Sequence, residues 1–508
     1  MKVYLMYRNQ DFTLENALLS NESDLIQDLE LNTLLEVMAH GDDFLRQVAK
    51  RALLSSLTVP EEIVYRQQVL IDSLKCPSVI RGIYETTIEA IQADKKIWWW
   101  VSKSPESTLH RSVELLGEFL GILRKLRQIT DANSESFQSE GFNRFFKMIT
   151  IELSDEYLFN IQDQLRRLKF ENEIVVSATL GKGCKGENYI LRRPSDKKRS
   201  WMSRYLPKGI PANAFTIAER DEAGHQALSE LRAVTVNEVA NILAQSTDHI
   251  FNFFKALRTE LGFYIGCLNV HEQLVRKGEP TCIPTVLKDE AQSLFAQDLY
   301  DICLSLQLEE RAVGNDVAAD NKNLVIITGA NQGGKTTFLR SVGLAYLMMQ
   351  CGMFVPAKHF TSNTFQRIFT HFKRREDVTM SSGKLDEEMK RMSEIADQVT
   401  TNSILLCNES FSSTNEIEGS QIARQVIDAL LDAGITVFFV TFLIDFAEEV
   451  LDRRANTTLF LRAERLESGQ RTFKMIQGEP LSTSYGEDLY KQVFGIEYGR
   501  NHDPKVLS

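Results

Sequence analysis

The chain has 508 residues and a formal net charge of −11, with 43% hydrophobic and 25% charged residues. This composition is typical of a water-soluble globular protein, and the length allows about two to four domains. The acidic balance excludes a surface that attracts nucleic acid as a whole, so any nucleic-acid contact must come from a local basic patch.

A helical region is predicted over residues 31–172, after an N-terminal segment of residues 1–30. Apolar side chains recur there at three- and four-residue spacing, as at Leu45, Val48 and Ala52, which is the period of one helix face. Proline is rare in this region and stands where a helix would begin or end. We therefore expect an all-helical core or lever region.

The pattern changes over residues 173–218. Two short strand-like runs, residues 174–178 and 189–191, flank the glycine-rich residues 181–186, which predicts a small β insertion. A basic stretch follows, and it either contacts a DNA backbone or forms a solvated loop. Its candidate DNA-contacting residues are Arg192, Arg193, Lys197, Lys198 and Arg199.

A long helix is predicted within residues 219–283. Residues 225–261 contain neither proline nor glycine and keep a helical apolar period. Some 37 residues at about 1.5 Å each would span roughly 55 Å. Such a helix would act as a lever or arm on which the small insertion is carried.

From residue 284 to residue 508 the chain alternates apolar runs with helix-length segments, which predicts an α/β domain. The runs at residues 324–327, 403–407 and 437–440 show no alternation of polar and apolar side chains. That pattern is typical of parallel strands that are buried on both faces.

The first of these strands leads into the sequence GANQGGKT at residues 329–336, which satisfies GxxxxGK[ST]. A helix is predicted to follow from about residue 335 to residue 349. Backbone amides of such a loop and the positive end of the helix dipole cradle phosphate oxygens. Lys335 would then reach the β- and γ-phosphates and the Thr336 hydroxyl would bind Mg²⁺. A chance glycine-rich turn is the alternative.

The strand at residues 403–407 ends in Asn408 and Glu409, as a Walker B strand ends in its polar pair. Glu409 would polarise the attacking water. Asn408 stands where an aspartate usually supports Mg²⁺, and its neutral amide is the weaker partner. The strand at residues 436–440 is followed by Phe442, where ATPases of this layout commonly have a histidine that contacts the γ-phosphate. The alternative is a core strand capped by polar residues.

Residues 323–352, with the double glycine at Gly333 and Gly334, resemble the phosphate-loop block of the MutS family. Further stretches are similar to the family's signature segment, to its Glu-rich stretch after Walker B and to its C-terminal pattern. They are residues 367–371, 376–377, 381–383, 409–419 and 484–486. We also expect His371 to be structural and Glu387 and Glu388 to lie on a solvated helix face.

The resemblance implies an all-helical lever and core region with a small β insertion, followed by a P-loop ATPase domain of the ABC type. It also implies a homodimer that clamps DNA, double-stranded or branched, in which each signature segment completes the partner's nucleotide site. The first thirty residues have no Phe-x-Glu motif, so we expect no mismatch-reading domain, and we expect no nuclease-like extension after the ATPase domain.

The resemblance also assigns site residues. Glu409 would be catalytic, Thr336 and Asn408 would hold Mg²⁺, and ATP would be the cofactor. The residues expected to bind ATP or ADP are Gly329, Asn331, Gly333, Gly334, Lys335, Thr336, Thr337, Ser382 and Gly383.

Three functions compete. The first is a DNA-binding ATPase that works as a dimeric clamp in DNA repair or recombination control, with slow hydrolysis. The second is a nucleotide-binding structural module with negligible turnover that binds a target other than a mismatch; Asn408 and Phe442 favour it and Glu409 opposes it. The third is a small-molecule kinase, which the long helix opposes.

The compartment is predicted from what the sequence lacks. It has no apolar run near the ~20 residues that a membrane-spanning helix needs, and its start does not resemble a signal peptide. Its seven cysteines lack CxxC spacing, which argues against a zinc site and suits a reducing compartment. We expect a cytoplasmic protein with no membrane partner.

Overall fold

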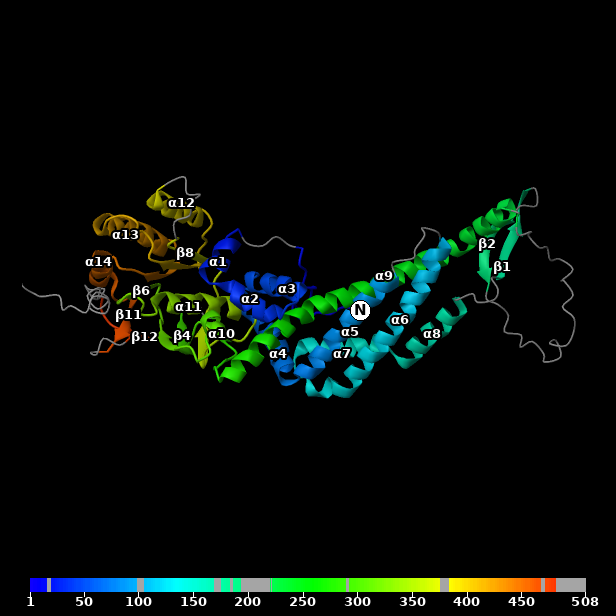
Figure 1. Cartoon of the computed structure of the whole chain (residues 1–508), viewed down its shortest axis with the longest axis horizontal. Helices are drawn as coiled ribbons and strands as arrows, with labels where there is room; N and C mark the ends of the chain where they lie inside the picture. Colours follow the sequence, from blue (N-terminus) through cyan, green and yellow to red (C-terminus); the bar gives the residue numbers. More distant parts are fainter. Residues whose placement is uncertain are drawn as a thin grey trace, which may run out of the picture. The chain divides into compact units, whose positions relative to one another are not determined.

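The computed structural model describes residues 1–15, 20–97, 105–168, 175–182, 186–192, 220, 222–288, 292–374, 383–466 and 471–480. Two compact units make up the chain. Unit 1 comprises Met1–Val3, Ser78–Phe137 and Phe142–Glu260, and unit 2 comprises Tyr4–Pro77, Gln138–Gly141 and Leu261–Ser508. Figure 1 gives the element labels used below.

Unit 1 is built mainly from helices, as the apolar spacing predicts. They are α5 (Pro77–Ile97), α6 (Pro105–Asn133), α7 (Glu140–Glu152), α8 (Asp155–Leu168) and the first part of α9 (Glu222–Lys277), with the short 3-10 helix η2 (Ser134–Ser136) after α6. Proline opens α5 and α6, where its fixed φ and missing N–H cost the helix nothing. A core cluster joins α6, α8 and α9 through Leu116, Leu165 and Val236.

The small β insertion has the two predicted strands. β1 (Val175–Leu180) pairs with β2 (Gly186–Arg192) in antiparallel orientation, with Val175 opposite Arg192. Of the basic stretch, only the backbone of Arg192 belongs to the described residues. Arg193, Lys197, Lys198 and Arg199 lie outside them, so their contact with DNA stays a prediction.

Helix α9 is longer than predicted, at 56 residues, because it continues past Gly262 to Lys277. The prediction ended the helix at the first glycine, and glycine in a helix interior costs only about 1 kcal/mol relative to alanine. In unit 2 that cost is offset by close packing, since a Cβ built on Gly262 would lie 3.3 Å from Leu45 Cδ2.

The N-terminal helices of unit 2 are α1 (Glu22–Asp28), α2 (Leu31–Ala39), α3 (Asp43–Leu54) and α4 (Pro60–Lys75). Asp42 caps α3, because its side chain accepts a hydrogen bond from the Phe44 amide. The end of α9 packs on this group: the Asn269 side-chain amide donates to the Met38 carbonyl oxygen at 2.9 Å.

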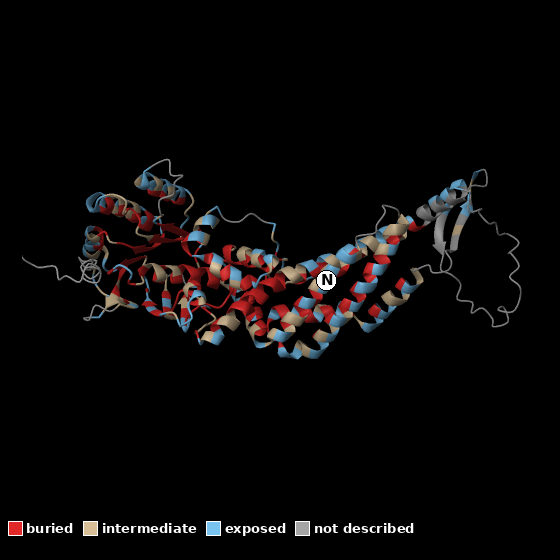
Figure 2. Ribbon diagram, in the orientation of Figure 1, coloured by how far each residue is buried: buried red, intermediate tan, exposed pale blue. Residues whose placement is uncertain are grey.

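Within the described part of unit 2, six strands form one sheet in the order β12-β11-β6-β10-β9-β8. All of its pairs are parallel except β11 with β12. The bounds are β6 (Leu324–Thr328), β8 (Ile368–Phe372), β9 (Ile404–Asn408), β10 (Thr436–Val440), β11 (Thr458–Arg465) and β12 (Arg471–Gln477). The three strands predicted from unalternating apolar runs, β6, β9 and β10, are neighbours, and Figure 2 shows the sheet as buried.

Helices cover both faces of this sheet. Leu405 and Cys407 of β9 share a core cluster with Ile427 and Phe446, which places α13 (Glu416–Asp432) and α14 (Ile444–Arg454) on one face. Leu406 points to the other face, where a Cβ on Gly343 of α11 (Lys335–Gln350) would lie 2.6 Å from it. A further helix, α12 (Lys384–Ala396), follows β8 along the chain.

A second sheet in unit 2 was not predicted from the sequence. Its order is β3-β7-β4-β5, with β3 (Thr285–Val286), β4 (Leu294–Leu299), β5 (Asn315–Ala318) and β7 (His359–Ser362). These strands are two to six residues long, too short for an apolar period to show. The helix α10 (Ile302–Gln307) follows β4. Across the described ranges, no helix is both long enough and apolar enough to cross a membrane.

Candidate functional site

The glycine-rich loop connects β6 to α11, as its motif predicts. Gly329 has φ +109° and Gly334, the N-cap of α11, has φ +90°, conformations that side-chain-bearing residues rarely adopt. The helix therefore begins at Lys335, with the free N–H groups of its first turn beside the loop. Those amides and the positive end of the helix dipole favour an anion at this point.

Lys335 is buried beneath the loop. Its Nζ donates to the carbonyl oxygens of Gly329 and Ala330, both at 2.9 Å, and lies 4.2 Å from the centre of the Phe442 ring. Burial lowers the pKa of Lys335 to about 8, and the negative charge of Glu409 opposes that shift. The ammonium group is therefore held by dipoles and an aromatic face, which an incoming anion can supplement.

The two residues predicted to hold Mg²⁺ meet at the junction of α11 and β9. The Thr336 hydroxyl donates to Asn408 Oδ1 at 3.0 Å. Because its proton is directed to Asn408, both lone pairs of the Thr336 oxygen remain available to a cation. Hydroxyl and amide oxygens suit Mg²⁺, which accepts oxygen ligands, but neither is charged. The residues fit a cation whose remaining ligands are water and phosphate.

Glu409 directly follows β9 and lines the same cavity as the glycine-rich loop. Its backbone has φ +56°, a left-handed conformation that costs a non-glycine residue about 1–3 kcal/mol. The Glu409 amide donates to the carbonyl oxygen of Val440 at the end of β10, at 2.9 Å. This hydrogen bond to β10 thus stabilises a backbone conformation of Glu409 that is unfavourable by itself.

The residue after Glu409 is anchored to β8. Ser410 is buried, and its hydroxyl oxygen lies 2.7 Å from Nδ1 and 2.9 Å from the carbonyl oxygen of His371. The other ring nitrogen of His371 lies 3.0 Å from the carbonyl oxygen of Glu388 in α12. Burial, with a smaller contribution from Arg391, lowers the pKa of His371 to about 4. The structural role predicted for His371 is confirmed.

The prediction of a solvated face at Glu388 was wrong. Glu388 is only 2% exposed, and its Oε1 accepts a hydrogen bond from the Ser413 hydroxyl at 2.7 Å. Burial raises the pKa of this carboxyl group. The reason is helical geometry: Glu388 stands on the same face of α12 as the buried Met392 and Ile395.

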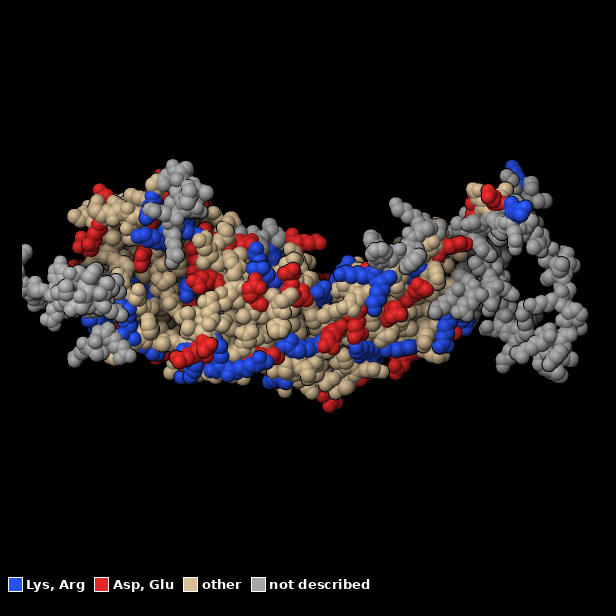
Figure 3. Space-filling model, in the orientation of Figure 1, with Lys and Arg blue, Asp and Glu red and all other residues tan. Residues whose placement is uncertain are grey.

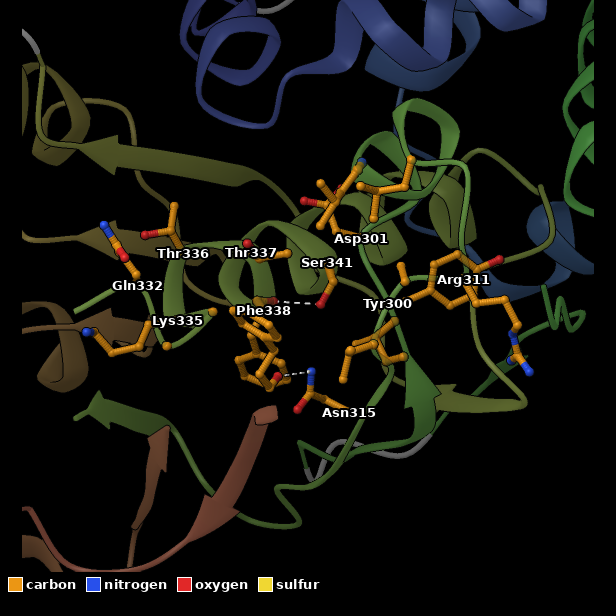
Figure 4. A pocket seen from close by; sticks show the side chains of 18 of the residues that line it. Tyr300, Asp301, Arg311, Asn315, Gln332, Lys335, Thr336, Thr337, Phe338 and Ser341 are labelled. Carbon is orange, nitrogen blue, oxygen red and sulfur yellow. Dashed lines mark hydrogen bonds between the residues drawn. The ribbon is translucent and has the colours of Figure 1, made fainter. Parts of the chain in front are cut away.

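A cavity of about 750 Å³ opens at the start of α11 (Figure 4). One side is the glycine-rich loop, with Lys335 and Thr336. Across it, Figure 4 shows Tyr300 and Arg311, which belong to the segment joining β4 to β5. The cavity also has an apolar part, to which Leu308, Val313 and Phe473 contribute. It therefore combines an anion-binding side with an apolar lining, part of which, Phe473, lies against Gly334.

Most of the predicted site residues lie together. Those lining the cavity are Asn331, Gly333, Gly334, Lys335, Thr336, Thr337 and Glu409. Gly329, the first residue of the loop, accepts a hydrogen bond from Lys335 through its carbonyl oxygen, and Asn408 contacts Thr336. Gly383 is the N-cap of α12, in a different part of unit 2, and Ser382 lies outside the described residues.

Other lining residues were missed by sequence reasoning. Phe473 comes from β12, far from the glycine-rich loop along the chain, and Val313 comes from the segment after α10. Asn315 links two of these segments, because its side chain contacts the Phe473 carbonyl oxygen at 3.4 Å and accepts from the Met475 amide at 2.6 Å. No local motif marks these positions, since only the fold brings them to the loop.

Comparisons with known proteins match two parts of this chain to families. Residues 58–277 match the family model described as the MutS2 N-terminal domain, and residues 325–494 match MutS domain V. The second match contains the glycine-rich loop, Asn408 and Glu409. A looser resemblance of the helical region to the MutS family is expected from the sequence, but its MutS2 branch is not, because the helical patterns carry no motif specific to one branch.

Curated relatives include the DNA mismatch repair protein MutS of Thermotoga neapolitana, 34% identical over 37% of this chain and 23% of the relative. The endonuclease MutS2 of Thermus thermophilus is 29% identical over 38% of the chain and 27% of the relative. Human MutS protein homolog 4 is 25% identical over 50% of the chain and 26% of the relative. The alignments thus cover about a quarter of these relatives' length. With both its helical region and its α/β region matched by family models, the chain belongs to the MutS family.

Proposed function

We propose that this chain binds ATP with Mg²⁺ and hydrolyses it slowly, as the ATP-dependent part of a DNA-binding protein in repair or recombination control. The observation that carries the proposal is the cavity that joins the glycine-rich loop, Lys335, Thr336 and Glu409. It lies beyond the carboxyl ends of parallel strands, the usual ligand position in open α/β sheets.

The cavity has the two kinds of surface that a nucleoside triphosphate needs. The amides at the start of α11 and the Lys335 ammonium group receive the phosphates. The apolar part beside Val313 and Phe473 receives the base. Its volume of about 750 Å³ falls in the usual range for small-molecule sites, roughly 300–1,000 Å³.

Thr336 and Asn408 would hold Mg²⁺, directly and through water. The ion would neutralise charge that develops on the phosphate oxygens. Glu409 would orient and polarise the attacking water from its fixed position after β9. The Glu409 carboxylate is thus the general base of this proposal.

Slow hydrolysis follows from two substitutions. Asn408 brings no negative charge to the metal side, and Phe442 cannot donate a hydrogen bond to the γ-phosphate. The Phe442 ring instead faces the Lys335 ammonium group at 4.2 Å, an attractive cation–π contact. Phe442 therefore supports binding by Lys335 rather than bond cleavage, and the ATP-bound state would be long-lived.

DNA is the proposed macromolecular partner, because relatives are named as a DNA mismatch repair protein and an endonuclease. On the face of unit 1 seen in Figure 3, basic and acidic side chains are interspersed over the described helices. The basic stretch from Arg192 to Arg199 thus remains the proposed phosphate-contacting element, on a clamp-like insertion at residues 173–218. A homodimer whose Ser382 and Gly383 complete the partner's site, and a cytoplasmic location, belong to the same proposal.

A nucleotide-binding module with negligible turnover is the second candidate, and Asn408 together with Phe442 favours it. Single-turnover ATP hydrolysis, measured alone and with duplex or branched DNA, separates the two. Slow hydrolysis that needs Glu409 supports the ATPase. Nucleotide binding with no hydrolysis under any condition supports the module. If calorimetry detects no ATP binding, both are wrong.

A further inference from the structure

We propose that Glu279, assisted by Lys277, is a positioning residue that holds the base-side wall of the nucleotide cavity. The wall is the segment of residues 308–313, which lines the cavity opposite the glycine-rich loop. Through these two residues the C-terminal end of α9 sets the affinity for the nucleoside part of the ligand. The inference rests on the proposed function and adds a residue and a route of coupling to it.

Glu279 is an acidic side chain buried against the wall. The side chain is 0% exposed, and its Oε1 accepts from the Ala312 amide at 2.7 Å and from the Ser305 hydroxyl at 2.9 Å. Oε2 lies 3.4 Å from Arg311 Nε. A carboxylate that is fully removed from water is stabilised only by such bonds. The contacts with Ala312 and Arg311 fix the wall to Glu279, and the contact with Ser305 adds the end of α10.

Lys277 is the last residue of α9, and it contacts the end of α10 and the start of the wall. Its Nζ donates to the carbonyl oxygens of Ser305 and Leu308. These carbonyls belong to the end of α10 and the residue after it, whose helical partners are missing, so a lysine ammonium group is a favourable partner. The wall thus donates a hydrogen bond to Glu279 through the Ala312 amide and accepts one from Lys277 through the Leu308 carbonyl oxygen.

Glu279 is fixed to α9 although it lies beyond the helix. Gly278 has φ +69°, and the Glu279 amide donates to the Leu274 carbonyl oxygen at 3.0 Å, a Schellman-type helix end. The carboxylate therefore moves with the last turn of α9. Any displacement of that turn is passed to the Ala312 amide, which borders the cavity.

The start of α10, the helix that leads to the wall, is attached to α11. Two nitrogens of Arg340 lie 2.8 Å from Asp301 Oδ2, and Asp301 caps α10 by accepting from the Leu304 amide at 3.1 Å. The wall and the α10 helix before it are thus attached to α11 at one end and to the end of α9 at the other. By linkage, a nucleotide that orders this wall must favour one position of the end of α9, and that position must favour the nucleotide.

The phosphate end of the cavity is built from other contacts. Lys335 bonds Gly329 and Ala330, and Thr336 bonds Asn408. Figure 4 places Lys335 and Thr336 across the cavity from Arg311. Loosening the wall should therefore weaken recognition of the nucleoside and leave recognition of the triphosphate unchanged. A variant that merely disturbs folding would weaken both.

The test uses calorimetry on the full chain with two probes, ATP and inorganic tripolyphosphate, both in Mg²⁺ buffer. Glu279→Ala should weaken ATP binding about tenfold, the usual effect of removing hydrogen bonds to a charged group. Binding of tripolyphosphate should stay within about twofold of the unaltered protein, the scatter expected for a substitution distant from the phosphates. Lys277→Met, at a partly exposed position, should give a smaller loss with the same selectivity.

Two controls make the outcome specific. Glu279→Gln retains an Oε1 that can accept from both Ala312 and Ser305, so it should bind ATP nearly as well as the unaltered protein. Asp72→Ala removes another buried carboxylate, in α4, which accepts from the amides of Gln138 and Ser139 at 2.9 and 2.7 Å. Asp72→Ala should therefore lower the folding stability as Glu279→Ala does, and it should leave the binding of both probes unchanged.

The possible results separate the two proposals. If the unaltered protein binds neither probe, the nucleotide site itself is wrong. If it binds both, but Glu279→Ala and Lys277→Met leave ATP affinity unchanged or weaken both probes equally, the positioning role is wrong. Selective loss of ATP binding in both variants, with recovery in Glu279→Gln, supports it.

Discussion

The pKa of Lys335 predicts how nucleotide affinity depends on pH. Burial holds that pKa at about 8, compared with 10.5 for an ordinary lysine. A bound phosphate stabilises the ammonium form, so the pKa in the complex lies above its value in the free protein. The affinity for nucleotide is therefore highest well below pH 8, where Lys335 is protonated. It falls as the pH rises through 8 toward the pKa of the complex.

The magnitude follows from the protonated fraction. Between pH 7 and pH 9, the protonated fraction of free Lys335 falls from about nine-tenths to about one-tenth. The dissociation constant for ADP should then rise about tenfold, or about 1.4 kcal/mol. With an ordinary lysine pKa of 10.5, the same change of pH would alter the constant by only about 3%.

Calorimetric titration with ADP and saturating Mg²⁺ measures this effect without hydrolysis. Lys335→Arg is the matched control, because a guanidinium group stays charged throughout this range. Its affinity should be independent of pH, and Lys335→Ala should bind at least about tenfold more weakly than the unaltered protein at pH 7. Unchanged affinity in the unaltered protein between pH 7 and pH 9, or an equal fall in Lys335→Arg, would refute the reasoning.

Two further predictions concern hydrolysis and DNA. Asn408→Asp combined with Phe442→His should speed single-turnover hydrolysis about 10²–10³-fold, the usual effect of one preorganised donor. Glu409→Gln should abolish hydrolysis. Equal rates for the unaltered protein and the double variant would show that neither group is limiting. Replacing the basic stretch with serine should weaken binding to duplex DNA and reduce the log–log salt slope by about 0.9 for each phosphate that is no longer neutralised, and an unchanged slope would identify a solvated loop. The residues replaced are Arg192, Arg193, Lys197, Lys198 and Arg199.

The sequence predicts the phosphate end of the site because its signals are local. The GxxxxGK[ST] motif specifies the loop, the helix start and the placement of Lys335 within a few residues. The strand that ends at Asn408 has four apolar residues in a row, so its burial on both faces was predictable too, although its place beside β10 was not. Motif and periodicity agree here, and the predicted strands and helix were confirmed.

The base end was not predictable, because its contacts join distant segments. Glu279 binds Ala312, 33 positions later, and Asn315 binds the Phe473 backbone, 158 positions later. Nothing in the composition around these residues differs from an ordinary loop. The end of α9 was missed for a related reason, since the packing of Gly262 on Leu45 is not visible along the chain.

The contacts of His371 also determine where its single proton lies. With its pKa near 4, the imidazole is neutral at pH 7. The Glu388 carbonyl oxygen, 3.0 Å from Nε2, can only accept, so the proton is on Nε2. Nδ1 must then accept, and the Ser410 hydroxyl, which lies 2.7 Å from Nδ1 and also 2.9 Å from the His371 carbonyl oxygen, is the donor within reach. A carbonyl group of α12 thus selects the tautomer of His371, and through it the orientation of a hydroxyl group one residue from Glu409.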